Sequence, residues 1–298
     1  MNQNVLNLLR SRLLERGPLG SLQDSVLKRT AALNTWGTNA IEGSTVTYDD
    51  ARRILLEGKT VGGKPVREVL ETLQHERAFR GLYQRLKEEI TLGTALELHE
   101  GVFLHILPDA GRWRRENFRI RGAGYTPPRM EKVVGEMEEW ESRYRQMDLE
   151  GEDVFRTGAW MHFNLERIHP FRDGNGRTGR LLLNLHFLRH SWPPVHILPR
   201  NRGDYLASLN LAARGDLGSL EGLLKVAMGS SLVDLLDQVG TSEDELLPLK
   251  LVARQTPYGE QYLAVRCMQG EIPAIKTGGR WRTSLAAVKI YNGEVGRK

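Results

Sequence analysis

Twelve consecutive residues, 169–180, hold most of the side chains in this sequence that suggest chemistry. They read His-Pro-Phe-Arg-Asp-Gly-Asn-Gly-Arg-Thr-Gly-Arg. Gly174 and Gly176 permit positive φ angles, and after glycine an asparagine such as Asn175 tolerates this left-handed region best. Successive N–H groups can then point into one concavity that binds anions. A predicted helix begins directly afterwards, so the positive end of its dipole faces the same concavity, and the pattern predicts a polyphosphate site.

Four side chains add charge and acid–base chemistry to this concavity, and a fifth, Phe171, is expected to anchor the loop in the core. Arg177 and Arg180 are three residues apart and therefore lie on one face of the predicted helix. Asp173 beside phosphates suggests a shared Mg²⁺, because this cation binds oxygen ligands. His169 ends the preceding helical stretch. An imidazole with a pKa of about 6.5 suits the removal of a proton from an attacking hydroxyl.

Two other interpretations of these residues remain open. The loop is a glycine-rich connector without chemistry if His169 is only a buried cap. Alternatively, His162, Glu166 and His169 share one helical face at spacings i, i+4 and i+7 and form a zinc site. This trio lacks the HExxH spacing of known zinc helices, so we favour the anion site.

The elements that position this loop are predicted to be helices. Apolar residues recur at three- and four-residue spacing over 152–168 and 178–191, on either side of the loop, and over most of the first 248 residues. One stretch differs: over 115–128, the alternation of Phe118 and Ile120 with polar neighbours predicts a short β-hairpin. Turn signals separate the helices at 62–65, 124–128, 191–194 and 201–204.

Composition narrows the class of protein. The chain has 298 residues, 40% of them hydrophobic, which allows one large domain or two to three smaller ones. No stretch approaches the roughly 18 consecutive apolar residues of a membrane span. The first residues show no cleavage-site pattern, and the single Cys267 excludes an intrachain disulfide framework and a multi-cysteine zinc site. These features predict a cytoplasmic protein that does not bind membranes.

The loop resembles the signature of the Fic family, H-P-F-x-[D/E]-G-N-G-R-x-x-R, and residues 169–180 agree with it at every specified position. The resemblance spans about 100–240 and includes 111–128, which is similar to the hairpin flap that holds a target segment in extended form. It implies a mostly α fold, a Fic-type helical core with a β-hairpin flap.

The resemblance also implies an activity and a role for each residue. AMP passes from ATP to a Ser, Thr or Tyr hydroxyl of a protein, including the enzyme itself. His169 is then the general base and Asp173 the Mg²⁺ ligand. The phosphate-transferring branch of the family departs from the G-N-G-R turn, which is intact here, so AMP is favoured over phosphate. The residues implied in nucleotide binding are Gly174, Asn175, Gly176, Arg177, Thr178, Gly179, Arg180 and Tyr205.

Two further segments resemble parts of the family. Residues 201–205 are similar to the region that closes over adenine, so Tyr205 is a candidate for stacking on the base, although a core tyrosine is the other interpretation. Residues 38–43 resemble the inhibitory motif [S/T]-x-x-x-E-[G/N]. A salt bridge between Glu42 and Arg180 would occupy the γ-phosphate position; a solvated glutamate is the alternative. Relatives often dimerise, so a homodimer is a further expectation.

The end of the chain is basic. Residues 249–298 carry nine Lys and Arg against three Glu, a net charge of +6, which leaves −1 for the rest of the chain. The pattern predicts two helical stretches and an extended pair around a Gly-Gly turn, followed by the segment 284–291. Residues 261–284 resemble the winged helix-turn-helix modules of excisionases and the MerR group. This likeness implies DNA binding through Lys276, Arg280 and Arg282, with Trp281 packing the wing.

We therefore expect three parts: an N-terminal helical region over 1–95 with the inhibitory motif 38–43, a Fic catalytic core over 96–240, and a winged helix-turn-helix domain over 245–298. The leading function is Mg²⁺- and ATP-dependent protein adenylylation restrained by Glu42. The alternative is a DNA-binding regulator whose Fic domain mainly senses nucleotide. The tail is also open to a role in docking target proteins or in dimerisation.

Overall fold

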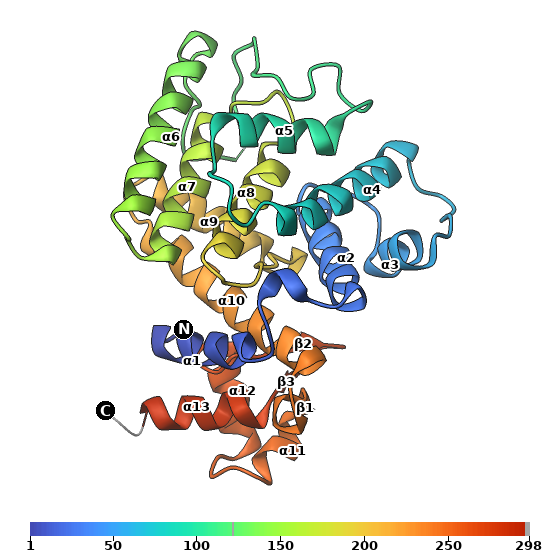
Figure 1. Ribbon diagram of the computed structural model, residues 1–298, viewed down its shortest axis with the longest axis vertical. Helices are drawn as coiled ribbons and strands as arrows, with labels where there is room; N and C mark the ends of the chain where they lie inside the picture. The colour runs from blue at the N-terminus through green and yellow to red at the C-terminus, as the bar shows by residue number, and fades with distance from the viewer. Residues whose placement is uncertain (121, 296–298) are drawn as a thin grey trace. The chain divides into compact units, whose positions relative to one another are not determined.

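The computed structural model describes residues 1–120 and 122–295, and they form a mostly helical protein (Figure 1). The chain folds into two compact units. The larger unit contains residues 23–191 and 196–221, and the smaller contains 1–22, 192–195 and 222–298. This division differs from the expected boundaries in two places. Residues 1–22 and residues 222–239, most of the helix that precedes the basic tail, belong to the same unit as the C-terminal segment.

The described residues of the larger unit form eight complete helices and the start of a ninth. The complete helices are α2 (Asp24–Ile41), α3 (Tyr48–Glu57), α4 (Val66–Gly81), α5 (Leu92–Phe103), α6 (Val133–Leu149), α7 (Val154–Ile168), α8 (Asn175–Arg189) and α9 (Arg202–Ala212). Short 3₁₀ turns cover Leu82–Gln84, Met130–Lys132 and Pro199–Asn201.

The predicted helices beside the loop are confirmed as α7 and α8, which lie side by side with α6 against α7 (Figure 1). Asp153 caps the start of α7 and accepts hydrogen bonds from the N–H groups of its first turn. Glycines let the two helices approach closely. A Cβ at Gly158 would press on the His186 ring, and one at Gly179 would press on His162.

The expected β-hairpin over 115–128 is wrong for the part of this segment that the structure describes. Residues 115–120 and 122–128 form no strands; Arg121, at the expected tip, lies outside the described residues. A turn joins the N–H of Ala123 to the carbonyl of Ile120. The arms bind side chains elsewhere instead of each other: the N–H of Gly124 donates to Asn210 at 2.7 Å. These contacts replace the cross-strand bonds that a two-stranded ladder needs.

The smaller unit contains α1 (Gln3–Leu14), most of α10 (Gly218–Val239), α11 (Leu249–Ala253), α12 (Glu260–Met268) and α13 (Leu285–Val295). Its strands are β1 (Leu247–Pro248), β2 (Ile275–Thr277) and β3 (Arg280–Thr283), and 3₁₀ turns cover Leu19–Ser21 and Ser242–Asp244. The strands form an antiparallel sheet in the order β1-β3-β2. The predicted extended pair around Gly278 and Gly279 is thus confirmed, and both glycines have positive φ, as a tight hairpin turn requires.

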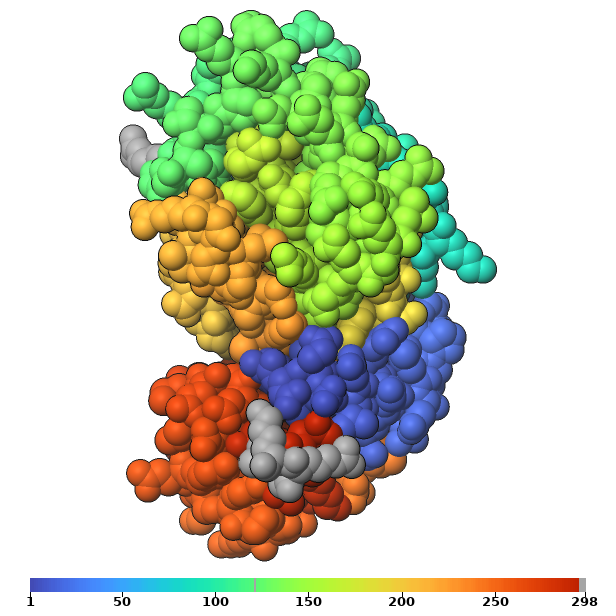
Figure 2. Space-filling model, turned by 90° about the vertical axis from the view of Figure 1, so that its left-hand side faces the viewer, coloured from blue at the N-terminus to red at the C-terminus, as the bar shows by residue number. Residues whose placement is uncertain are grey.

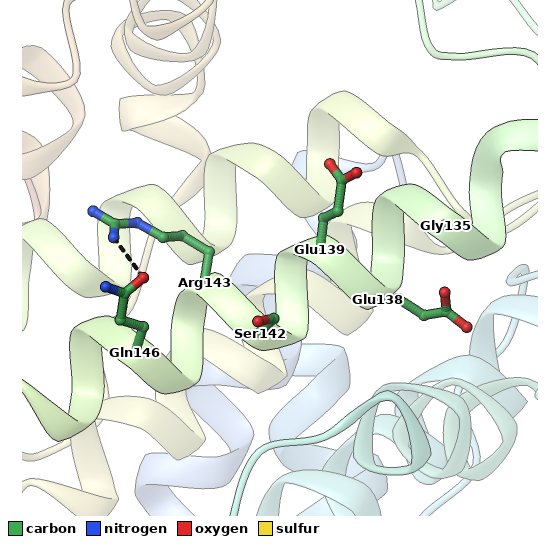
Figure 3. A pocket seen from close by; sticks show the side chains of 6 residues that line it. All are labelled: Gly135, Glu138, Glu139, Ser142, Arg143 and Gln146. Atoms are coloured by element: carbon green, nitrogen blue, oxygen red, sulfur yellow. Dashed lines mark hydrogen bonds between the residues drawn. The ribbon is translucent and has the colours of Figure 1, made fainter.

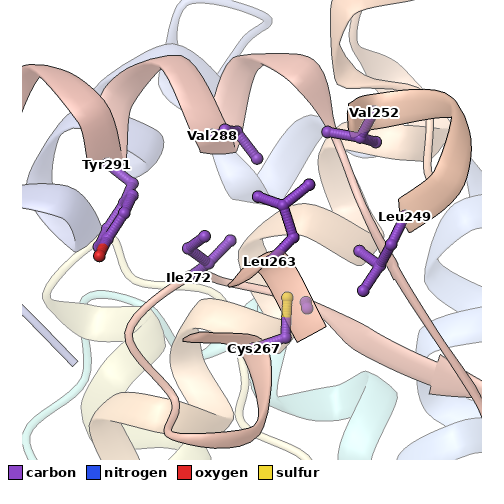
Figure 4. Close-up of a cluster of buried hydrophobic side chains, with 8 residues drawn as sticks. Leu249, Val252, Leu263, Cys267, Ile272, Val288 and Tyr291 are labelled. Atoms are coloured by element: carbon purple, nitrogen blue, oxygen red, sulfur yellow. The ribbon is translucent and has the colours of Figure 1, made fainter. Parts of the chain in front are cut away.

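An apolar cluster holds this C-terminal segment together. Figure 4 shows side chains from α11, α12, α13 and the segment before β2 converging on Leu263 of α12. Cys267 is one of them and is buried, so it serves packing. Helix α1 belongs to the same unit, and its Arg12 forms an ion pair with Asp244 at 2.6 Å. Figure 2 shows the N-terminal segment, in dark blue, beside the C-terminal segment, in red.

Among the described residues, none of the helices combines the length and the apolar character that crossing a bilayer requires.

Candidate nucleotide site

The loop from α7 to α8 has the left-handed backbone that an anion-binding turn requires. His169 ends α7 with φ 52° and Gly174 precedes α8 with φ 82°. Gly176 does not use its freedom, because it lies in the first turn of α8, as does Asn175. The concavity is therefore the start of a helix behind one left-handed glycine, and its first free N–H groups point outward along the helix axis.

Side chains below the loop fix its shape. Asn175 binds both backbone groups of Phe171, accepting from its N–H at 2.9 Å and donating to its carbonyl at 2.8 Å. Phe171 is fully buried, as expected, and stacks on the His99 ring at 3.8 Å. His99 accepts from the N–H of Gly111, so its other nitrogen carries the proton that binds the carbonyl of Asp173 at 3.0 Å. The loop is thus preorganised.

Arg180 is buried, with 4% exposure, and is held by α2. Its Nε donates to Thr38 Oγ1 at 2.6 Å, and its Nη2 donates to Glu42 Oε1 at 2.6 Å. Nη1 approaches the Tyr205 hydroxyl at 3.4 Å. The expected salt bridge between Glu42 and Arg180 is therefore present in the structure.

The Glu42 carboxylate lies directly over the start of α8. A Cβ added to Gly176 would collide with Glu42 Oε1 and would also press on Arg180. Burial by itself raises the pKa of Glu42, but the charge and hydrogen bond of Arg180 outweigh burial, so its pKa falls below the ordinary value and it is an anion at neutral pH. A carboxylate anion held by Arg180 thus lies beside the first turn of α8.

Arg177 and Asp173 are also occupied, by two residues of α4 that the sequence did not single out. Arg177 Nη1 binds Glu71 Oε2 at 2.8 Å, and both side chains are less than a tenth exposed. Arg67 binds the other oxygen of Glu71 at 2.8 Å and Asp173 Oδ2 at 2.7 Å. Arg177 closes the ring by contacting Asp173 Oδ1 at 3.4 Å. Four charged groups of alternating sign therefore surround the mouth of the loop.

The donor chemistry of this mouth suits a hard cation. The Asp173 side chain is 43% exposed and already attracts two guanidinium groups. Burial alone raises its pKa, but Arg177 and Arg67 outweigh burial, so the pKa lies below the ordinary value and the group is a carboxylate. An ionised, accessible oxygen ligand beside an anion site fits Mg²⁺.

Buried polar atoms without partners also lie along the loop. Among the described residues, His169 Nδ1, Arg177 Nε and Thr178 Oγ1 are buried and have no hydrogen bond. Such atoms are uncommon in native structures because each costs free energy. The ones on His169 and Arg177 fit a site that gains partners when a ligand binds. Thr178 and Gly179 are packed inside, against α7 in the case of Gly179, and their role in nucleotide binding stays a prediction.

His169 is mostly buried beside these groups. Burial lowers its pKa to about 4, so its imidazole is neutral at pH 7 and able to accept a proton. One turn earlier, burial raises the pKa of Glu166 to about 7.

The structure places Tyr205 in the core. The residue is 1% exposed, and its hydroxyl binds His162 Nε2 at 2.7 Å. Its ring therefore offers no open face to adenine, which corrects the stacking expectation in favour of a core tyrosine. The structure does not support the zinc alternative. His162 binds the Tyr205 hydroxyl, and within the described part of the chain the ligand atoms of His162, Glu166 and His169 do not form a group that could hold a metal ion.

Arg114 is another residue that the sequence analysis missed. It is 3% exposed, and its guanidinium donates to the carbonyls of His169 at 2.8 Å, Glu116 at 2.6 Å and Pro128 at 2.6 Å. Its own N–H binds the carbonyl of Pro170. This arginine ties both ends of the 115–128 segment to the α7–α8 loop. Nothing in its spacing distinguishes it from its arginine neighbours, because its partners are backbone carbonyls, which residue types do not reveal.

Two other features carry no chemistry. Asp148, His186 and His190 bring ligand atoms within 4.8 Å of one another. However, both nitrogens of His186 are used, by Tyr144 and by the carbonyl of Val154, and Arg189 contacts Asp148. The shallow depression in Figure 3 is lined by six residues of one side of α6 and includes no residue of the α7–α8 loop.

Comparison with known proteins agrees with this geometry. The Fic/DOC family model matches residues 89–187. Protein adenylyltransferase fic-1 of Caenorhabditis elegans is 32% identical over 230 residues, which cover 74% of this chain and 44% of that protein. A solved fragment of Fic-1 from the same organism is 30% identical, with a TM-score of 0.67, and the match covers 79% of this chain and 72% of the fragment.

A Fic domain containing signaling protein from Bacteroides thetaiotaomicron shares the fold, with a TM-score of 0.71 at 21% identity, over 79% of this chain and 97% of that one. The chain spans less than half the length of the curated relatives that it matches. The signature loop, the helical fold and the identity to Fic proteins all indicate the same family. The chain belongs to the Fic/DOC family.

Proposed function

We propose that this protein transfers AMP from ATP to a Ser, Thr or Tyr hydroxyl of a protein, including itself, and that Glu42 restrains the reaction. The observation that carries the proposal is the Glu42 carboxylate bound to Arg180 over the start of α8. A helix start with an anion held beside it by an arginine of the same helix, on a loop that begins with an imidazole, is suited to a phosphate ester. The adenylyltransferases among the relatives support AMP as the transferred group.

The chain's own groups supply positioning and charge. The N–H groups at the start of α8, Arg177 and Arg180 would bind the phosphates and align the α-phosphorus beside His169. Asp173 would hold Mg²⁺, which neutralises phosphate charge. The hydroxyl oxygen then bonds to the α-phosphorus, the bond to the bridging oxygen breaks, and pyrophosphate leaves. His169 accepts the hydroxyl proton, and the nearby phosphate charge raises its pKa from the low value of the free protein.

Glu42 restrains this reaction by occupying Arg180. Its carboxylate lies where the γ-phosphate would bind, so ATP must displace it or bind in a pose unfit for in-line attack. The pair is buried on the Arg180 side, with 5% exposure against 37% for Glu42. A charge-assisted bond with one desolvated partner is strong enough to compete with a phosphate.

Intact mass measurement tests the reaction class. Purified Glu42→Gly protein with ATP and Mg²⁺ is expected to gain one or more AMP moieties, and Glu42→Gly with His169→Ala is expected to gain none. Wild-type protein should gain far less than the Glu42→Gly variant. A mass increase equal to a phosphate, or an AMP gain that survives His169→Ala, would contradict the proposal.

A second candidate function rests on the C-terminal segment, which we propose is a DNA-binding winged helix-turn-helix. The order α11, α12, β2-β3 hairpin and α13 supports it, as do the exposed Lys276 and Arg280 beside the hairpin turn. Arg282 is less suited to phosphates, because its Nη1 binds the carbonyl of Leu246 at 3.0 Å. On this reading the protein is a regulator, and the nucleotide site is its sensor.

A salt series of DNA shift assays with the full chain tests this candidate. Wild-type protein should lose affinity steeply as salt rises, and Lys276→Ala with Arg280→Ala should reduce the slope of log affinity against log salt by about two. Lys250→Ala with Arg254→Ala serves as a control of equal charge. An identical slope for both double variants would show that the β2-β3 hairpin does not contact DNA phosphates.

A further inference from the structure

Arg67 binds the carboxylate that we assign to Mg²⁺. Its Nη2 donates to Asp173 Oδ2 at 2.7 Å, while its Nε holds Glu71 at 2.8 Å. The other Asp173 oxygen, Oδ1, accepts from the N–H of Gly174 at 2.7 Å and is approached by Arg177. Oδ2 is therefore the oxygen that would face an incoming cation, and Arg67 occupies it.

The position of Arg67 in α4 does not serve the helix. The residue lies in the first turn, directly after Val66, which follows the N-cap Pro65. A positive side chain is disfavoured there, because the helix dipole is positive at the same end. The contacts with Asp173 and Glu71 account for an arginine at this position.

The two ion pairs of this ring differ in how easily they open. Arg177 and Glu71 are both less than a tenth exposed, so separating them would leave a buried charge unpaired. Arg67 is 53% exposed and Asp173 43%, so water can replace each partner at little cost. Of the four charged groups, Arg67 is the one that can leave.

We propose that Arg67 is an internal cation that holds Asp173 in the nucleotide-free protein and that Mg²⁺ displaces it when Mg²⁺ and ATP bind. The inference rests on the proposed function, which gives Asp173 its role as metal ligand. Competition for one oxygen means that Arg67 raises the Mg²⁺ concentration that ATP binding requires. It also keeps the carboxylate paired and ordered until the metal arrives.

Calorimetric titration with ATP over a series of Mg²⁺ concentrations, including a metal-free arm with EDTA, tests the inference. It compares Glu42→Gly protein with the same protein carrying Arg67→Gln. The half-saturating Mg²⁺ concentration for ATP binding should fall about two- to fivefold in the Arg67→Gln protein, as expected for removal of a half-exposed ion pair. Without Mg²⁺, its ATP affinity should not rise.

Arg77→Gln is the matched control, because Arg77 is an exposed arginine of the same helix. It should leave the half-saturating Mg²⁺ concentration unchanged. An equal Mg²⁺ dependence of the Arg67→Gln and Arg77→Gln proteins would overturn the inference alone. So would weaker ATP binding by Arg67→Gln at every Mg²⁺ concentration, since Arg67 would then be a phosphate ligand. Absence of any ATP binding by the Glu42→Gly parent would instead overturn the proposed function.

Discussion

Two glutamates hold the two arginines in the first two turns of α8, Arg177 and Arg180, and they do so from very different positions. Glu42 is the C-cap of α2, its side chain is 37% exposed, and Gly43 with φ 94° follows it. Glu71 lies inside α4 and is 8% exposed. Their ion pairs have nearly equal lengths, 2.6 Å to Arg180 and 2.8 Å to Arg177.

The difference lies in what surrounds each carboxylate. Glu42 stands at a helix end before a glycine, so a change of a few backbone angles can withdraw it. Glu71 is fixed by its helix and binds two arginines at once. We infer that Glu42 is a removable competitor of phosphate, whereas Glu71 is a permanent counter-ion that orients Arg177. The two ion pairs have similar lengths, but substitution of Glu42 and substitution of Glu71 are therefore expected to change ATP affinity in opposite directions.

The largest expected effect is that of Glu42→Gly on ATP affinity. Removal of a charged competitor from a buried arginine is worth about 3 kcal/mol, so ATP should bind roughly a hundredfold more tightly. Isothermal titration of both proteins with ATP and Mg²⁺ measures this difference. Equal affinities would show that Glu42 does not compete with the nucleotide.

Glu71→Gln should act in the opposite direction. Arg177 would lose its buried counter-charge, so the free energy of unfolding should fall by about 3 kcal/mol and ATP affinity in the Glu42→Gly background should not increase. Chemical denaturation and titration measure the two quantities. Glu76→Gln, on the same helix, is the control. A gain in ATP affinity from Glu71→Gln would show that Glu71, like Glu42, competes with phosphate.

Thr38→Val probes another contact that holds Arg180. Thr38 Oγ1 accepts from Arg180 Nε at 2.6 Å, and its loss costs about 1 kcal/mol. In the Glu42→Gly background this should weaken ATP binding about fivefold. Thr30→Val is a matched control, because Thr30 is buried on the same helix and its hydroxyl has no partner among the described residues. If both variants weaken binding equally, the effect is one of packing.

The smallest expected effect is that of pH on the restraint. The pKa of Glu42 lies below its ordinary value, so the ion pair is fully formed above that value and weakens only as pH falls below it. The ratio of AMP transfer by Glu42→Gly to that by wild type should therefore stay constant between roughly pH 8 and pH 6. A ratio that falls toward one near pH 6 would indicate that Glu42 takes up a proton there.

The sequence predicted the loop well because its information is local. The left-handed Gly174 and the buried Phe171 follow from residue types within a few positions of one another. The helix begins at Asn175, three residues before the predicted start, so Asn175 and Gly176 are helical and not left-handed. The contact between Glu42 and Arg180 joins residues 138 positions apart, and only the resemblance to the family suggested it.

The rest depended on packing between distant elements. Arg67 and Glu71 have the spacing of an ordinary surface helix pair, and only the packing of α4 brings them to the loop. The hairpin prediction was wrong because the alternation of apolar and polar residues over 115–128 does not reflect strand pairing in the described part of this segment. Arg114 and Asn210 instead bind the backbone of this segment. Periodicity carries no information about such side-chain contacts.

A crystal structure of the Glu42→Gly protein with Mg²⁺ and a non-hydrolysable ATP analogue tests the central claim most directly. We predict a γ-phosphate oxygen bound to Arg180 in the space that the Glu42 carboxylate occupies here, with the α-phosphate beside His169. A nucleotide bound elsewhere, or one whose α-phosphate lies beyond the reach of that imidazole, would contradict the account.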